Sequence, residues 1–127
     1  MNSKTTAKKR LILLAVLTAL AAIYLVPLGG YPLLEPDEGR YAEIPREMLE
    51  SGNFITPMLN YVQYFEKPAM LYWMNAASFA AFGQNEFAAR FASAVCALLG
   101  AAVTGALASL IFGSGAGILA SVMTALS

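Results

Sequence analysis

Long apolar runs alternate with a polar region along the chain, and this pattern predicts helices that span a membrane. The first apolar run covers residues 11–30, and the polar region follows at 35–90. A second apolar run occupies 91–112, and a third runs over 116–127. A spanning helix needs about 20 apolar residues to cross a hydrocarbon core of about 30 Å. The pattern therefore predicts two complete spanning helices and the beginning of a third.

The first apolar run also shares features with a cleaved signal peptide. A basic segment, residues 1–10, precedes it, and Ala19 and Ala21 form an A-x-A pattern within it. The run continues to Leu28, well past that pattern, and this favours an uncleaved membrane anchor. Because basic segments stay on the cytoplasmic side, we expect the N-terminus in the cytoplasm and the polar region on the external face of the inner (plasma) membrane.

Composition supports an all-α integral membrane protein. Hydrophobic residues make up 58% of the 127 residues and charged residues only 13%, whereas soluble domains carry about 25% charged residues. The acids all lie between Glu35 and Glu86, and no charge follows Arg90. The basic N-terminal cluster is small and leads directly into an apolar run, so it predicts membrane topology and no nucleic-acid partner.

The polar region is expected to contain two short amphipathic helices that lie on the membrane surface. The first covers 35–52, with Asp37 as its N-cap, a kink at Pro45 and a stop at Gly52. The second covers 68–82, and the segment between the two is expected to be extended or looped. One face of the first helix carries apolar residues at helical spacing, namely Tyr41, Ile44, Met48 and Leu49.

Small residues recur at four-residue spacing in the second apolar run, in two stripes. Such stripes allow helices to approach each other closely in lipid. The first stripe is Ala97, Ala101 and Gly105, and the second is Gly100, Thr104 and Ala108.

Two charged motifs flank the predicted surface helices and contain the candidate chemistry. The motif at 35–41 reads EPDEGRY, and the motif at 64–68 reads YFEKP. Charged groups at a membrane surface need partners or water. Arg and Lys side chains in these motifs can pair with a bound phosphate. The carboxylates can act as a general base or bind a metal ion.

A purely structural interpretation of these charges stays open at this point. Charged residues are common on the solvated flanks of membrane helices. In that case Asp37 only caps a helix, and Arg40 only pairs with Glu43 or Glu47 on the same helix.

The order of the motifs resembles a known family. The stretch Glu35 to Leu49 is similar to the first external loop of bacterial aminoarabinose lipid A transferases, which are relatives of the dolichyl-phosphate-mannose protein mannosyltransferases (glycosyltransferase family 39). The resemblance covers about residues 11–112 and departs from the family at Gly39, often Thr, and at Pro45, where Ser is expected. Further matching segments follow in the same order: Tyr64 to Pro68, Tyr72-Trp73, Asn85 to Phe87 and Arg90-Phe91.

The resemblance implies a GT-C fold and a glycosyltransferase that takes a sugar from a polyprenyl-phosphate carrier. The acceptor would be a lipid similar to lipid A or a protein, and aminoarabinose is the expected sugar. Asp37 would then be the catalytic carboxylate, whereas Arg40, Tyr41 and Lys67 would bind substrate or phosphate. Glu66 would be the carboxylate that binds a divalent metal ion, if the reaction uses one.

Two other functional classes compete with this one. A small membrane scaffold subunit would pack through the glycine and alanine stripes. A transporter would need ionisable groups at the membrane midplane, and the sequence has none between Leu11 and Leu28 or between Phe91 and Phe112. Because the third apolar run is only about a dozen residues long, too short to span, we expect the chain to be a part of a longer protein and inactive by itself.

Overall fold

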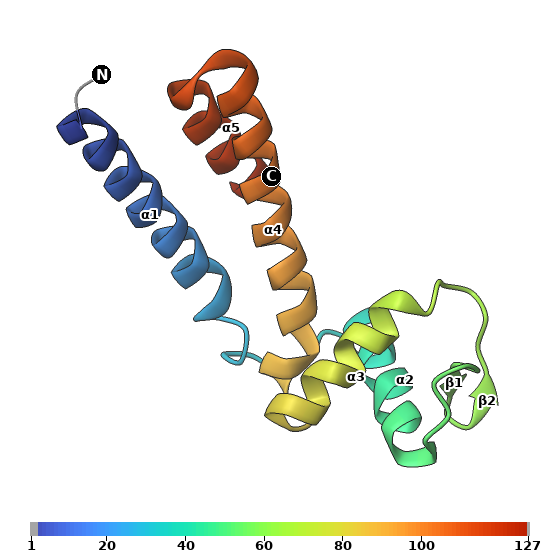
Figure 1. Ribbon diagram of the computed structural model, residues 1–127. Helices are drawn as coiled ribbons and strands as arrows, with labels where there is room; N and C mark the ends of the chain where they lie inside the picture. The colour runs from blue at the N-terminus through green and yellow to red at the C-terminus, as the bar shows by residue number, and fades with distance from the viewer. Residues whose placement is uncertain (1–2, 127) are drawn as a thin grey trace. The chain divides into compact units, whose positions relative to one another are not determined.

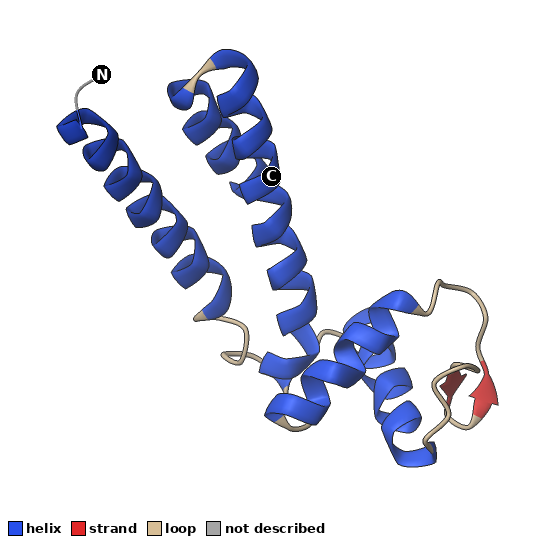
Figure 2. Ribbon diagram, in the orientation of Figure 1, coloured by secondary structure: helices blue, strands red, loops and turns tan. Residues whose placement is uncertain are grey.

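The computed structural model describes residues 3–126 and consists mostly of helices (Figure 1). It divides into two compact units. We call Pro27–Ser93 the loop unit, and 3–26 with 94–126 the apolar unit. The helices are α1 (Ser3–Leu25), α2 (Asp37–Ser51), α3 (Met70–Phe82), α4 (Glu86–Phe112) and α5 (Ser114–Leu126). The strands are β1 (Met58–Leu59) and β2 (Val62–Gln63), drawn in red in Figure 2.

Helix α4 is apolar and long enough to cross a membrane. It has 27 residues, and its most apolar stretch has a mean hydropathy of 2.2 with only 11% of that stretch buried. Among the residues whose side chains the structure describes, no other helix passes the same test: the apolar part of α1, Ala15–Leu25, and helix α5, Ser114–Leu126, are shorter. An apolar helix that stays uncovered suits a lipid environment better than a protein core. Helix α1 ends at Leu25, inside the predicted span of residues 11–30.

The apolar unit has a small core between α1, α4 and α5. Leu20 of α1, Ala101 of α4 and Ala125 of α5 are buried together. Val16, Tyr24 and Leu98 pack against them. The Tyr24 hydroxyl also donates a hydrogen bond to the Ala125 carbonyl, so α1 and α5 are joined near the C-terminal end of α1.

One of the two predicted small-residue stripes forms the contact between α4 and α5. A Cβ atom added to Gly105 would lie 2.9 Å from the Gly117 carbonyl oxygen and would overlap the Ser121 hydroxyl. That hydroxyl donates to the Ala101 carbonyl at 3.0 Å. Gly100, on the second stripe, has no atom within 4 Å of such a Cβ position. The first stripe therefore brings the helices together, whereas Gly100 faces open space.

The loop unit is organised around the amphipathic helix α2, which packs against α3 and β1. Ile44, Met48 and Tyr72 are buried at the centre of this packing, which confirms the predicted apolar face. Helix α2 is continuous through Pro45, where the sequence predicts a kink. Tyr41, Leu59, Tyr64 and Ala69 surround this core.

The N-cap prediction for Asp37 is wrong, because Asp37 is the first residue of α2 and its side chain makes no capping hydrogen bond. The backbone carbonyls of Leu34 and Pro36 already accept the amides of Glu38 and Arg40, at 3.0 and 3.3 Å. The first turn therefore needs no side-chain cap. The Asp37 side chain instead stays 74% exposed.

A short hairpin occupies part of the segment that the sequence predicts as extended or looped. Strands β1 and β2 pair antiparallel through a two-residue turn at Asn60 and Tyr61, with φ angles of 53° and 61°. Asn tolerates this conformation well, and Tyr does so only with support. The Tyr61 amide donates to both oxygens of the buried Glu47 carboxylate at 3.1 and 3.2 Å. The turn is therefore attached to α2.

The ends of the short helices largely follow the sequence. Gly52 ends α2 in the left-handed region with φ 70°, which confirms the predicted stop. Helix α3 starts at Met70, two residues after Pro68, and ends at Phe82, where Gly83 follows as the C-cap with φ 80°. The Ser78 hydroxyl donates to the Ala88 carbonyl at 2.7 Å and joins α3 to the beginning of α4.

Candidate functional site

A continuous path of polar side chains joins the two charged motifs. The two residues that connect the motifs lie 24 positions apart in the sequence. Arg40 Nη1 donates to the Tyr64 hydroxyl at 3.3 Å. The Tyr64 hydroxyl donates in turn to Glu66 Oε2 at 2.8 Å. At the other end, Arg40 Nη2 lies 3.9 Å from Asp37 Oδ1. We call these four residues the Asp37–Glu66 path.

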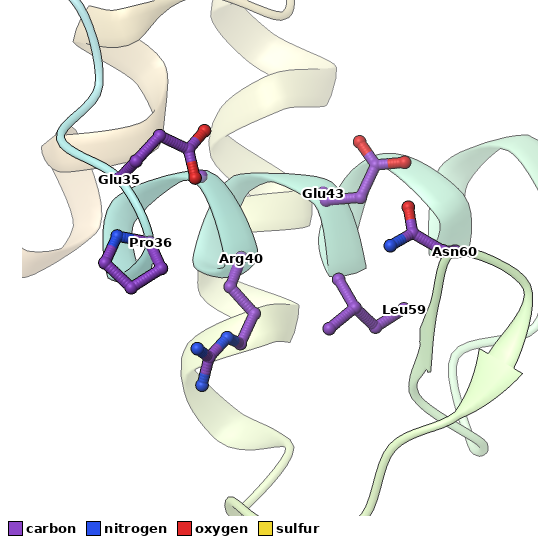
Figure 3. A pocket seen from close by; sticks show the side chains of 7 residues that line it. Glu35, Pro36, Arg40, Glu43, Leu59 and Asn60 are labelled. Carbon is purple, nitrogen blue, oxygen red and sulfur yellow. The ribbon is translucent and has the colours of Figure 1, made fainter.

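Arg40 lines a cleft of about 350 Å³ in the loop unit, and it is the one cation among the described residues that line this cleft (Figure 3). In this view the guanidinium points away from the Glu35 and Glu43 carboxylates, which lie across α2. Its hydrogen bond to Tyr64 raises the pKa of Arg40, so this group keeps its charge. The cleft is lined by Glu35, Pro36, Gly39, Arg40, Glu43, Leu59 and Asn60.

The two helix partners considered for Arg40 are engaged elsewhere. Glu43 accepts two hydrogen bonds from Arg46, at 2.6 and 2.9 Å. The Glu47 carboxylate accepts the Tyr61 amide. The structural interpretation of Arg40 as a partner of these acids is therefore wrong. Its one carboxylate contact within 3–126 is the long, exposed one to Asp37.

The other candidate residues differ in their surroundings. Lys67 is exposed and forms no ion pair among the described residues, so its ammonium group is available to an anion. Tyr41 is half-buried, and its ring packs against Tyr72 with 6.1 Å between centroids. The Tyr41 carbonyl accepts a hydrogen bond from Asn75 Nδ2 at 3.2 Å. Tyr41 therefore lies on the core side of α2.

The residues around Glu66 do not complete a metal site. In the part of the chain that the structure describes, no three carboxylate, thiolate or imidazole groups converge as metal ligands do. The sequence contains no histidine, and the Glu66 carboxylate accepts a hydrogen bond from Tyr64. A divalent cation prefers several oxygen ligands at once.

Sequence reasoning missed the most extensive polar contact of the loop unit. Arg90 donates to Glu38 Oε1 at 3.0 Å and to Glu38 Oε2 at 2.7 Å. It also donates to the carbonyls of Leu28 at 2.7 Å, Tyr31 at 2.9 Å and Pro32 at 2.9 Å. The Tyr31 ring lies 4.0 Å from the guanidinium carbon. A lone arginine at the start of an apolar run was the available signal, because such a charge needs a partner.

The Glu38 contact predicts a dependence of stability on pH. The hydrogen bond from Arg90 and the Leu34 amide lower the pKa of Glu38 below its ordinary value of 4.5. The stabilisation is therefore complete above about pH 4.5 and is lost as pH falls through the lower value of the folded state. We expect faster amide exchange across residues 28–40 at acid pH, after correction for intrinsic rates. In Glu38→Gln this acid-induced increase should be smaller, and an unchanged increase would contradict the assignment.

Tyr72 carries a buried hydroxyl that has no hydrogen-bond partner within residues 3–126. Burial raises the pKa of this phenol. We expect Tyr72→Phe to preserve the free energy of unfolding or raise it by about 1 kcal/mol, because an unpaired buried hydroxyl is costly. Tyr64→Phe is the matched control, since it removes a hydroxyl bonded to Arg40 and Glu66 and should destabilise. Thermal denaturation would measure the stability of both variants, and an equal loss of stability in the two would contradict this expectation.

Known proteins resemble the chain over most of its length. The family described as dolichyl-phosphate-mannose-protein mannosyltransferase matches residues 9–127. An undecaprenyl phosphate-alpha-4-amino-4-deoxy-L-arabinose arabinosyl transferase from Shewanella sediminis is 55% identical over 92 residues, which is 71% of this chain and 17% of that protein. A second such transferase, from Pseudomonas fluorescens, is 52% identical over 68% of this chain and 16% of its own length. The chain thus spans about a sixth of these relatives.

A solved structure is also similar to the chain. ArnT from Cupriavidus metallidurans bound to undecaprenyl phosphate is similar with a TM-score of 0.78 and 36% sequence identity. The similarity covers 88% of this chain and 23% of that protein. This similarity confirms the predicted membrane fold of GT-C type.

Proposed function

The chain belongs to the dolichyl-phosphate-mannose-protein mannosyltransferase family, and from this premise we propose that it contributes active-site residues to a membrane glycosyltransferase. The donor is a sugar linked to polyprenyl phosphate. Relatives named for undecaprenyl phosphate aminoarabinose support this donor class, as does the solved relative that binds undecaprenyl phosphate. Family membership favours this function over the alternative of a scaffold subunit.

The observation that carries the proposal is the Asp37–Glu66 path. Cleavage of the sugar–phosphate bond leaves an anionic polyprenyl phosphate, and a fixed positive charge stabilises that leaving group. Arg40 is charged, and no short ion pair within 3–126 neutralises it. Exposed Lys67 follows directly after Glu66 and supplies a second cation for phosphate.

The exposed Asp37 carboxylate is the group placed to act on the acceptor. If the acceptor is a hydroxyl, Asp37 takes its proton as the oxygen attacks the sugar. If the acceptor is a phosphate, no strong base is required, and Asp37 orients the reacting groups. We place this chemistry on the external face of the inner membrane. The preferred acceptor is a lipid similar to lipid A, and a protein is the alternative acceptor.

The test is transfer by the purified full-length protein. Undecaprenyl-phosphate aminoarabinose would be supplied with lipid A, and the product detected by mass spectrometry. We expect Arg40→Gln to lower kcat/KM about tenfold or more, because a charge that meets phosphate is lost. Arg46→Gln is the matched control, since Arg46 is already paired with Glu43 and Glu50. The absence of transfer from any polyprenyl-phosphate sugar by the wild type would refute the proposal.

A further inference from the structure

The Arg90 guanidinium donates all its hydrogen bonds to one part of the loop unit. Arginine has five N–H donors, and the five hydrogen bonds of Arg90 go to the Glu38 carboxylate and to three backbone carbonyls. Arg90 is only 8% exposed. A charge withdrawn from water is destabilising unless hydrogen bonds replace its hydration. The guanidinium is therefore held in one orientation by its surroundings.

These hydrogen bonds fix the chain immediately before Asp37. The three carbonyls belong to Leu28, Tyr31 and Pro32, which lie in the segment that precedes α2. Glu38 Oε2 also accepts the Leu34 amide at 2.7 Å. One guanidinium thus sets both the path of residues 28–34 and the rotation of the first turn of α2.

That first turn contains the two residues with the proposed chemistry. Asp37 is the direct neighbour of Glu38 in sequence, and Arg40 follows two residues later. Neither Glu38 nor Arg90 contacts a member of the Asp37–Glu66 path through any hydrogen bond or ion pair found within 3–126. Any effect of the pair on the reaction must therefore pass through the position of the helix turn.

We propose that Arg90 and Glu38 are positioning residues of the transferase, which hold the first turn of α2 so that Asp37 meets the acceptor in the productive geometry. This inference rests on the proposed function. A displacement of about 1 Å at a reacting group can lower a rate about a hundredfold. Lysine cannot replace Arg90, because an ammonium has only three donors and lacks the planar fork that matches a carboxylate.

The experiment compares kcat per folded molecule in the full-length protein. Variants would be purified, their monodisperse fraction measured, and transfer assayed over a range of donor concentrations. We expect Arg90→Lys and Glu38→Gln to lower kcat about tenfold or more, and to raise the donor KM much less. The double variant should lose no more than the worse single variant, because the pair acts as one unit. Glu50→Gln, which breaks the exposed Arg46 pair of the same helix, should stay within about twofold of wild type.

A merely structural pair would give a different result. Arg90→Lys and Glu38→Gln would then lower the folded yield, while kcat per folded molecule stayed within about twofold of wild type, and this outcome would overturn the inference. Should Arg90→Lys not fold, Glu38→Gln decides, because it keeps the side-chain volume and an acceptor oxygen. A wild-type protein without transfer activity would refute the proposed function itself. An active wild type with equally active variants would refute only the positioning role.

Discussion

Asp37→Asn in the full-length protein is expected to lower sugar transfer about a hundredfold or more with little change in stability. Asn has nearly the same shape as Asp but lacks the charge that accepts a proton or orients a cation. The Asp37 side chain is 74% exposed, caps no helix end and has only a 3.9 Å contact with Arg40. Such a long, exposed ion pair contributes at most about 1 kcal/mol to folding.

The control for this prediction is Glu86→Gln. Glu86 is an exposed acid in the first turn of α4 and lies outside the Asp37–Glu66 path. Transfer to lipid A would be measured for both variants by mass spectrometry, with thermal denaturation as the test of folding. If Asp37→Asn transfers sugar as well as Glu86→Gln does, Asp37 is not the catalytic carboxylate.

The two acceptor classes lead to different residual activities. With a hydroxyl acceptor, loss of the base should remove most of the rate and shift its pH dependence, because no group then takes the proton. With a phosphate acceptor, the acceptor oxygen is already ionised, so Asp37→Asn should leave a larger residual rate. The comparison therefore reports on the acceptor as well as on Asp37.

Local sequence signals predicted the helices well. The apolar face of α2 follows from the spacing of Ile44 and Met48, since a helix turns every 3.6 residues. Gly52 ended the helix as expected, because glycine adopts positive φ at low cost. These features depend on residues within a few positions of one another, and such signals can be read without knowledge of the fold.

Contacts between distant residues could not be predicted in the same way. Glu38 and Arg90 lie 52 residues apart, and nothing in their local patterns selects one as the partner of the other. The same holds for Arg40 and Tyr64, although both belong to motifs that sequence analysis singled out. Charge alone suggested helix neighbours for Arg40, but Arg46 occupies Glu43 with better geometry. Partner choice depends on the fold, whereas the need for a partner is visible in the sequence.

Gly105→Ala is expected to destabilise the contact between α4 and α5 by about 1–3 kcal/mol. A methyl group at Gly105 would meet the Gly117 carbonyl oxygen at 2.9 Å and the Ser121 Cβ at 3.1 Å, besides overlapping the Ser121 hydroxyl. Two of these three atoms lie on or next to the α5 backbone. Rotation of the serine side chain alone cannot relieve the clash, and it would break the hydrogen bond to the Ala101 carbonyl.

Gly100→Ala separates this packing effect from the helix propensity of alanine. Both glycines lie inside α4, so both substitutions gain the same propensity of up to about 1 kcal/mol. Gly100 has no atom within 4 Å of the added methyl group, and its variant should be as stable as wild type or more so. Thermal or sodium dodecyl sulfate unfolding of the full-length protein would measure the difference. Equal stability of the two variants would mean that α4 and α5 can move apart at no cost, and close packing at Gly105 would then not hold them together.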